Sequence, residues 1–298
     1  MLKVNKLKVN LKLFISLKLP MFIERKLLIL FMFSVSLLPL YAQNGEKDES
    51  VYKVNRIVAV SIGVGGSAAS YFGIKKVRDK DEIPEDIVLS LDKYDVNSFD
   101  RGALFLNPEN RQTANSISDI GQYVTFFAPV LLLADRKIRS HWLDIGLMYF
   151  ETQAISTLLY AWSPLGPQFI DRYRPETYYD EINLKNRQSG QNQNSFFSGH
   201  ALVTSTASFF MAKVICDFHP ELDGKKWFIY GAALVPSAFV GYFRVKALRH
   251  FPTDVIAGTV IGAAIGFFVP HLHKKKKDSG LSIDTNIEGN GIALNYRF

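Results

Sequence analysis

The sequence is poor in cysteine, with Cys216 the single one among 298 residues. One cysteine excludes an intrachain disulfide, so cysteine content gives no information on the compartment. The sequence also lacks the alternation of strands and helices that builds a parallel sheet, which argues against an α/β fold. Apolar residues are abundant, at 48%, and 23 residues are phenylalanine. This composition favours several helices at membrane level, separated by polar loops.

Acidic residues are fewer than basic ones, 28 against 35, which gives a formal net charge of +7. This excess favours anionic partners, either nucleic acid or lipid headgroups. Much of it lies in the lysine-rich N-terminus and in Lys274 to Lys277, beside apolar segments. Basic runs in that position more often indicate membrane topology than a nucleic-acid surface.

Six apolar stretches are candidate helices. They are 57–74, 120–133, 142–162, 201–215, 227–243 and 255–269. The last one carries Gly258, Gly262 and Gly266 at a four-residue spacing, which lets two helix backbones approach closely. The tail alternates around the turn 288–291 and predicts a β-hairpin. The predicted fold is all-α, a membrane-embedded bundle of about six helices with a small C-terminal β-hairpin.

The N-terminal segment has the three-part form of a secretory signal. From Met21, a charged region precedes an apolar run, and a cut after Ala42 or Gln43 is plausible. An uncleaved anchor helix is the alternative. The expected organisation is an extension with the signal or anchor, a first helix with a polar loop, a helical core, and a basic linker with the hairpin. Their bounds are 1–43, 44–117, 118–273 and 274–298.

Three short segments place polar and charged residues at the ends of predicted helices. They are Asp171-Arg172-Tyr173-Arg174-Pro175, Ser198-Gly199-His200, and the stretch from Arg244 through His250 to Asp254. Arginines bind phosphate oxygens in bidentate fashion. A helix that begins at Ser198 and Gly199 adds free N–H groups and the positive end of its dipole. Together the segments therefore favour an anion site.

The same residues suffice for phosphoryl transfer without a metal or other cofactor. A histidine with a free ring nitrogen attacks phosphorus, and a carboxylate on its other nitrogen fixes the tautomer. His250 and Asp254 lie four residues apart, where Pro252 can begin a helix, so we expect a direct hydrogen bond between them. A second histidine, His200, can protonate the leaving alkoxide and later activate water.

This pattern resembles the type-2 phosphatidic acid phosphatase superfamily, which also contains bacterial acid phosphatases and vanadium haloperoxidases. The family's motifs are Lys-x6-Arg-Pro, Pro-Ser-Gly-His and Ser-Arg-x5-His-x3-Asp. Arg174-Pro175 matches the end of the first motif, and Phe197 to His200 and Phe243 to Asp254 match the others. Phe197 stands where the second motif has its proline, and Phe243 stands where the third motif has its serine. The resemblance covers about Trp142 to Pro270 and is to the membrane-associated lipid phosphate phosphatase branch.

The resemblance implies a role for each matched residue. His250 would be the nucleophile, Asp254 its orienting partner and His200 the general acid. The phosphate would be bound by Arg174, Arg244, Ser198 and Gly199. The first motif's lysine corresponds to Pro167. We expect Arg172 to supply the missing charge, because a cation substitutes for a cation.

The implied function is metal-independent hydrolysis of a phosphomonoester or pyrophosphate on a lipid, through a phosphohistidine. Candidate lipids are phosphatidic acid, phosphatidylglycerophosphate, undecaprenyl pyrophosphate and lipid A. The expected partners are this lipid phosphate and the membrane, without nucleic acid, and the oligomeric state stays open. Two alternatives remain: a broad-specificity periplasmic acid phosphatase and, given the missing lysine, a non-catalytic lipid-binding protein of the envelope.

Basic residues predict which end of the bundle faces the cytoplasm. The ends away from the motifs carry 135–139, 225–226 and 274–277, so we expect a bacterial-type envelope protein whose site faces the periplasm. A cleaved signal followed by a first helix that spans would instead place the site inside. We therefore expect the glycine-interrupted first helix not to cross fully. A periplasmic bundle that is only peripherally attached is the alternative.

Overall fold

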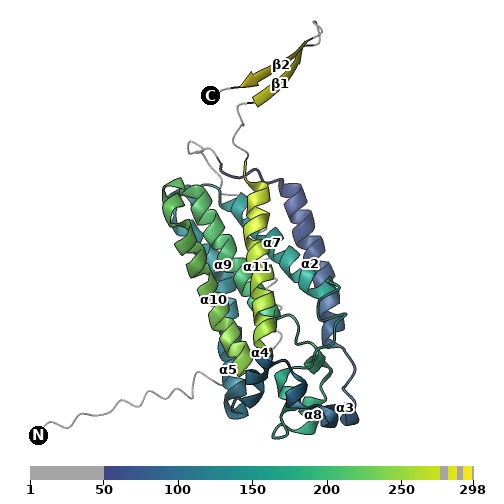
Figure 1. Ribbon diagram of the computed structural model, residues 1–298. Helices are drawn as coiled ribbons and strands as arrows, with labels where there is room; N and C mark the ends of the chain where they lie inside the picture. The colour runs from purple at the N-terminus through teal and green to yellow at the C-terminus, as the bar shows by residue number, and fades with distance from the viewer. Residues whose placement is uncertain (1–49, 276–280, 287–290, 297–298) are drawn as a thin grey trace, which may run out of the picture. The chain divides into compact units, whose positions relative to one another are not determined.

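The computed structural model describes residues 50–275, together with the backbone of 281–286 and 291–296. The signal or anchor expected in 1–43 lies outside the described residues. Six long helices lie side by side (Figure 1): α2 (Arg56–Arg78), α5 (Arg111–Phe127), α7 (Trp142–Trp162), α9 (Gly199–Phe218), α10 (Lys226–Lys246) and α11 (Pro252–His273). Each corresponds to one of the six predicted helices. The all-α bundle is therefore confirmed.

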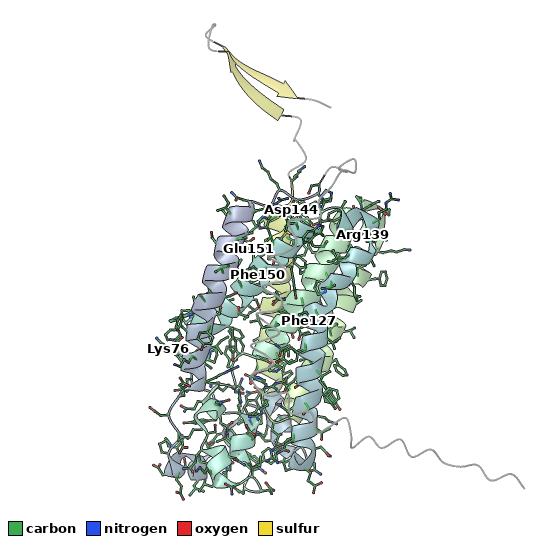
Figure 2. The ribbon with its side chains drawn as sticks, turned by 180° about the vertical axis from the view of Figure 1, so that it is seen from behind. Lys76, Phe127, Arg139, Asp144, Phe150 and Glu151 are labelled. Carbon is green, nitrogen blue, oxygen red and sulfur yellow. The ribbon has the colours of Figure 1, made fainter. Side chains whose placement is uncertain are left out.

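Short helices fill the connections between the long ones. They are α3 (Glu85–Ser90), η3 (Lys93–Asp95), α4 (Ser98–Arg101), η4 (Gly102–Phe105), η5 (Pro108–Asn110), η6 (Ala128–Ala134), α6 (Arg136–Arg139), η7 (Pro175–Tyr178), α8 (Leu184–Arg187), η8 (Gly190–Gln193) and η9 (Pro220–Lys225). Helices α3, α4 and α8 gather at one end of the bundle (Figure 1). Arg139 and Asp144 lie toward its other end (Figure 2).

Helix α9 is the central helix of the bundle, and α5, α7, α10 and α11 all pack against it. Buried hydroxyl side chains of α9 can donate to carbonyl oxygens of neighbouring helices. Ser205 Oγ donates to the Thr259 carbonyl at 2.8 Å, and Ser208 Oγ donates to the Ala233 carbonyl at 2.7 Å. Ser205 thus holds α11 beside α9, and Ser208 holds α10 there.

The glycines of α11 face α9, as their spacing predicts. A Cβ added at Gly258, Gly262 or Gly266 would lie 2.3–2.5 Å from a carbonyl oxygen of the segment that begins at Ser198. No side chain fits such a gap, so these positions allow the two backbones to touch. This contact brings the start of α11 beside the start of α9, where two of the motifs lie.

Helix α2 packs along α7 over much of its length. A Cβ at Gly63 would lie 2.3 Å from the ring of Phe150, which Figure 2 labels on α7. Further along, Trp162 Nε1 donates to the Ala69 carbonyl at 2.9 Å. At 23 residues, α2 is roughly 34 Å long, enough to cross a hydrocarbon core. The expectation that the first helix is too interrupted to cross is not supported.

Five helical segments within the described residues are long and apolar enough to cross a membrane. They are Arg56–Arg78, Pro108–Ala134, Gly199–Phe218, Pro220–Lys246 and Pro252–His273. Large apolar side chains on their outer faces are exposed, among them Phe72, Val124, Phe228 and Phe268. Exposed apolar surface of this kind on helices of this length supports a membrane protein.

Helix α5 begins at Arg111, whereas the apolar pattern placed its start near Ile120. Its first half is polar because one side of it faces the ends of α9 and α10, where it meets His200 and Arg244. A search for apolar stretches therefore misses this half.

The tail forms the predicted β-hairpin. Strand β1 (Leu281–Asn286) pairs antiparallel with β2 (Gly291–Tyr296). The register places Leu281 opposite Tyr296 and Asn286 opposite Gly291.

Candidate active site

A cavity of about 410 Å³ lies where α7 and α10 end and α9 and α11 begin. Five of the expected site residues line it: Arg174, Gly199, His200, Arg244 and His250. Three others do not line it: Arg172, Ser198 and Asp254. The three separate motifs therefore converge, and the two histidines share one cavity.

His250 is almost fully buried, at 2% exposure. Its Nδ1 lies 2.6 Å from the carbonyl oxygen of Ser195. A carbonyl only accepts hydrogen bonds, so Nδ1 carries the proton and Nε2 keeps its lone pair. Burial, and then the positive charges of Arg244 and Arg174, hold the pKa of His250 well below its ordinary value. The ring is therefore neutral, and its Nε2 can act as a nucleophile.

The direct bond expected between His250 and Asp254 does not form, because their nearest atoms, Nδ1 and Oδ2, are 3.9 Å apart. Asp254 Oδ2 instead accepts from Ser195 Oγ at 2.6 Å and from the backbone N–H of Phe251 at 2.8 Å, which caps α11. Asp254 therefore fixes Ser195, and the Ser195 carbonyl orients the histidine. Ser195 belongs to none of the three motifs, so the sequence analysis did not indicate it.

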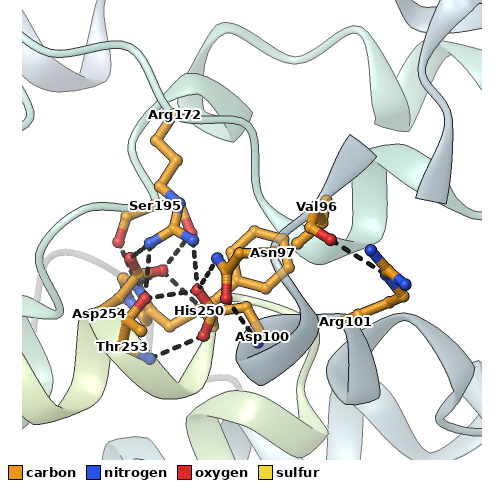
Figure 3. Close-up of polar contacts among 10 residues, drawn as sticks. Val96, Asn97, Asp100, Arg101, Arg172, Ser195, His250, Thr253 and Asp254 are labelled. Atoms are coloured by element: carbon orange, nitrogen blue, oxygen red, sulfur yellow. Dashed lines mark hydrogen bonds and ion pairs between the residues drawn. The ribbon is translucent and has the colours of Figure 1, made fainter. Parts of the chain in front are cut away.

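Arg172 takes a different place from the expected one. Its guanidinium forms an ion pair with Asp254 and a second one, at 2.6 Å, with Asp100 of α4 (Figure 3). It also donates to Thr253 Oγ1 at 2.9 Å. With these partners Arg172 lies on Asp254 and not in the cavity, so it does not replace the missing lysine there.

Asp100, which belongs to none of the motifs, is fully buried and pairs with Arg172. Burial acts to raise its pKa, but hydrogen bonds from Thr253, Asn97 and Arg172 outweigh burial and lower the pKa. Its carboxylate accepts from the Thr253 backbone N–H at 2.9 Å and from the Thr253 hydroxyl at 2.6 Å. Asp100 thus ties α4 to the first turn of α11.

His200 is paired with Asp119, a residue of α5 that no motif includes. Its Nε2 lies 2.8 Å from Asp119 Oδ1. The same carboxylate oxygen lies 3.4 Å from an N–H of Arg244. A carboxylate on one ring nitrogen orients the imidazole and leaves the other nitrogen for proton transfer. Asp119 was missed because it lies in the polar half of α5.

The arginines of the cavity differ in how they are held. Arg244 donates to Asn115 at 2.9 Å, and its buried Nε has no partner. Arg174 has no side-chain hydrogen bond or ion pair to any described residue. Burial, and then the charge of Arg249, lower the pKa of Arg174 to about 10, so it stays charged at neutral pH. Buried donors without partners are suited to an anion.

Ser198 and Gly199 begin α9 as predicted. Ser198 Oγ is the N-cap and accepts from the Ala201 N–H at 3.4 Å. Gly199 lines the cavity, and a Cβ there would lie 3.0 Å from the ring of Tyr160. The positive end of the α9 dipole therefore reaches the cavity at Gly199.

The model of the PAP2 superfamily matches residues 141–278, a range that contains all three motifs. Residues 141–278 belong to the PAP2 superfamily. This relationship supports phosphatase activity. No curated protein matches the chain. A solved structure that it resembles is that of a transmembrane PAP2 type phosphatidylglycerolphosphate phosphatase from Bacillus subtilis. The match has 19% identity and a TM-score of 0.40, and it covers 72% of this chain and 94% of that one.

The PAP2 domain departs from the family pattern at Pro167, where the lysine is expected. The Pro167 carbonyl accepts from Lys80 Nζ at 2.6 Å, and Lys80 also pairs with Asp171 at 2.6 Å. Lys80 does not line the catalytic cavity. Arg78, the last residue of α2, does.

The cavity of the PAP2 domain carries more positive than negative charge. Its lining includes four arginines and one carboxylate: Arg78, Arg174, Arg244, Arg249 and Asp119. Within residues 50–275, no group of three or more His, Cys, Asp or Glu side chains could hold a metal ion. The side chains gathered here are those that bind and attack a phosphate group.

Proposed function

We propose that the chain hydrolyses a phosphomonoester or pyrophosphate of a lipid through a phosphohistidine at His250. The observation that supports this most is that His250 and His200 line one cavity with Arg174 and Arg244. A neutral imidazole, a second imidazole and two guanidinium groups are the parts that phosphoryl transfer needs.

In the first step, His250 Nε2 attacks phosphorus, and the bond from phosphorus to the leaving oxygen breaks. The Nδ1 proton, which the Ser195 carbonyl holds, stays on the ring, so the phosphohistidine forms as a cation at the imidazole. His200 gives a proton to the leaving oxygen, and Asp119, 2.8 Å from Nε2, orients its ring. Arg174 and Arg244 neutralise the charge on the transferring phosphoryl oxygens.

In the second step, water attacks the phosphohistidine. His200, now neutral, takes a proton from the water, and the bond from phosphorus to Nε2 breaks. Phosphate leaves, and His250 returns to its neutral form. The cycle consumes one water and no other co-reactant.

The lipid character of the substrate is supported by the surroundings of the cavity. Its lining includes Ile74 and Val77 of α2 and Leu202 and Val203 of α9, which are apolar. Phosphatidic acid, phosphatidylglycerophosphate, undecaprenyl pyrophosphate and lipid A are the candidates. We propose that the cavity faces the periplasm of a bacterial-type envelope, since basic segments such as 135–139 flank the other end of the bundle.

The test is phosphate release by the purified full chain from a panel of these lipids, with a metal chelator present. His250→Ala should lower turnover by at least about a thousandfold, because the nucleophile is lost. His271→Ala, an exposed histidine near the far end of α11, should leave turnover unchanged. Equal turnover in the His250→Ala variant contradicts the mechanism. Lipid binding without phosphate release from any lipid points to the non-catalytic alternative.

A further inference from the structure

A second cavity, of about 790 Å³, adjoins the catalytic one. The two share four lining residues: Arg78, Asn115, Gln191 and Arg249. Two of these shared residues are arginines, so the border between the cavities is itself cationic. A ligand whose phosphate lies beside His250 can therefore extend past Arg78 and Arg249 into the second cavity, which we call the vestibule.

The lining of the vestibule is polar almost throughout. It comprises Arg78, Lys80, Glu82, Arg111, Gln112, Asn115, Ser116, Glu176, Lys185, Asn186, Ser189, Gly190, Gln191, Asn192, Ala247 and Arg249. Ala247 is the one apolar side chain in this set, so the vestibule lacks the apolar surface that an acyl chain needs to pack against. Five cationic side chains face two carboxylates, which favours an anion.

Some of the cationic side chains of the vestibule form ion pairs with protein carboxylates, and others do not. Lys80 is paired with Asp171, and Arg249 is paired with Glu176 at 2.6 Å. In the described part of the chain, the side chains of Arg78 and Lys185 form no hydrogen bond or ion pair, and only the backbone N–H of Lys185 donates, to Asn183 Oδ1 at 2.9 Å. Arg78 ends α2, and Lys185 lies in α8, so the two charges reach the vestibule from different elements.

We propose that the vestibule is a second anion subsite and that the substrate carries another anionic group, a phosphate or a phosphodiester, besides the phosphate that is cleaved. Arg78 and Lys185 bind this second group. For its place in catalysis the inference rests on the proposed function, but the binding itself does not depend on turnover.

Non-hydrolysable probes test the binding alone. The full chain in detergent is titrated calorimetrically with methylphosphonate and with methylene-, propylene- and hexylene-bisphosphonate. At least one bisphosphonate should bind about tenfold more tightly than methylphosphonate, the gain expected from one additional charge-assisted contact. Lys185→Gln, whose side chain lines the vestibule and not the catalytic cavity, should lose this gain and keep its affinity for methylphosphonate.

Lys75→Gln is the matched control, because Lys75 is exposed on the same helix as Arg78 and lines neither cavity. This variant should keep the full preference. A Lys185→Gln variant that loses affinity for all probes equally overturns the proposal, and so does a wild-type chain without preference for any bisphosphonate.

Inorganic phosphate distinguishes a tethered group from free phosphate. If free phosphate fills the vestibule, it should bind at two sites in the wild type and at one in Lys185→Gln, without a bisphosphonate preference. That result overturns the proposal of a two-anion substrate. Failure of the proposed function is seen separately, as a chain that prefers bisphosphonates but releases no phosphate from any lipid.

Discussion

At the residue scale, both histidines are held by groups that lie outside the motifs. The Ser195 carbonyl orients His250, and the Asp119 carboxylate orients His200. The sequence indicated the reacting residues because their types and spacing match a known chemistry. It could not indicate these partners, because a backbone carbonyl has no residue-type signature. Asp119 lies 81 residues from His200 in the chain.

Asp119 is expected to matter most when the leaving group is poor. An alkoxide needs a proton from His200 to leave, whereas p-nitrophenolate leaves without one. Asp119→Asn should therefore lower kcat for an alkyl phosphate by about a hundredfold and kcat for p-nitrophenyl phosphate by much less. Asp144 lies in the first turn of α7 and pairs with Arg56 of α2, so Asp144→Asn should leave kcat for both substrates unchanged. Equal losses on both substrates would assign Asp119 a purely structural role.

The pH dependence follows from the lowered pKa of His250. The neutral ring attacks, so activity is lost as the pH falls through the pKa of this residue. Because burial and the two arginines lower that pKa, the acid limb due to His250 should lie below pH 6.5. Arg174→Gln removes one positive charge and should move this limb to higher pH. The measurement is the pH profile of kcat/KM, and an acid limb that Arg174→Gln moves to lower pH would be inconsistent with this electrostatic origin.

At the element scale, the site is positioned by the close contact of α9 and α11. The four-residue glycine spacing predicted this contact correctly, because it is a local property of one helix. The start of α5 was predicted too late, since the polar first half of the helix turns toward the site and lacks an apolar stripe. Arg172 was misplaced for a related reason: its partner Asp100 lies on α4, and nothing near Arg172 in the chain indicates that helix.

A pair of glycine variants tests the helix contact. Gly262→Ala places a Cβ 2.3 Å from the Leu202 carbonyl oxygen, so it should destabilise the bundle by about 1–3 kcal/mol. Gly231→Ala lies on α10 with no atom within 4 Å, so it should be neutral or stabilising by up to about 1 kcal/mol. The measurement is the free energy of unfolding in detergent. Equal effects of the two substitutions would argue against the close contact.

At the scale of the whole molecule, the six long helices place every site residue near one end of the bundle. Helix α2 is long enough to span, and Tyr52 before it and Lys225 before α10 lie at the end of the bundle opposite the site. The charge pattern predicted that the basic segments lie at the end of the bundle opposite the motifs. It could not settle the first helix, because Gly63 and Gly66, which lower its apolar character, are positions where α7 packs against it.

Cysteine labelling tests the proposed orientation. In a Cys216→Ala background, Lys185→Cys near the site should react with a membrane-impermeant maleimide in intact cells. Lys225→Cys, at the other end, should react only after the cells are permeabilised. The reverse pattern would place the site in the cytoplasm. The expected pattern, with α2 spanning, would be incompatible with a signal cleaved after Ala42 or Gln43.

The most direct test of the mechanism is capture of the phosphorylated protein. The full chain is mixed with a substrate whose terminal phosphate is radiolabelled and is quenched in alkaline detergent. We predict a protein-bound label that is stable in alkali and lost in acid, as for a phosphohistidine, and that is absent from His250→Ala. A label that persists in His250→Ala, or that survives acid treatment, would contradict the account.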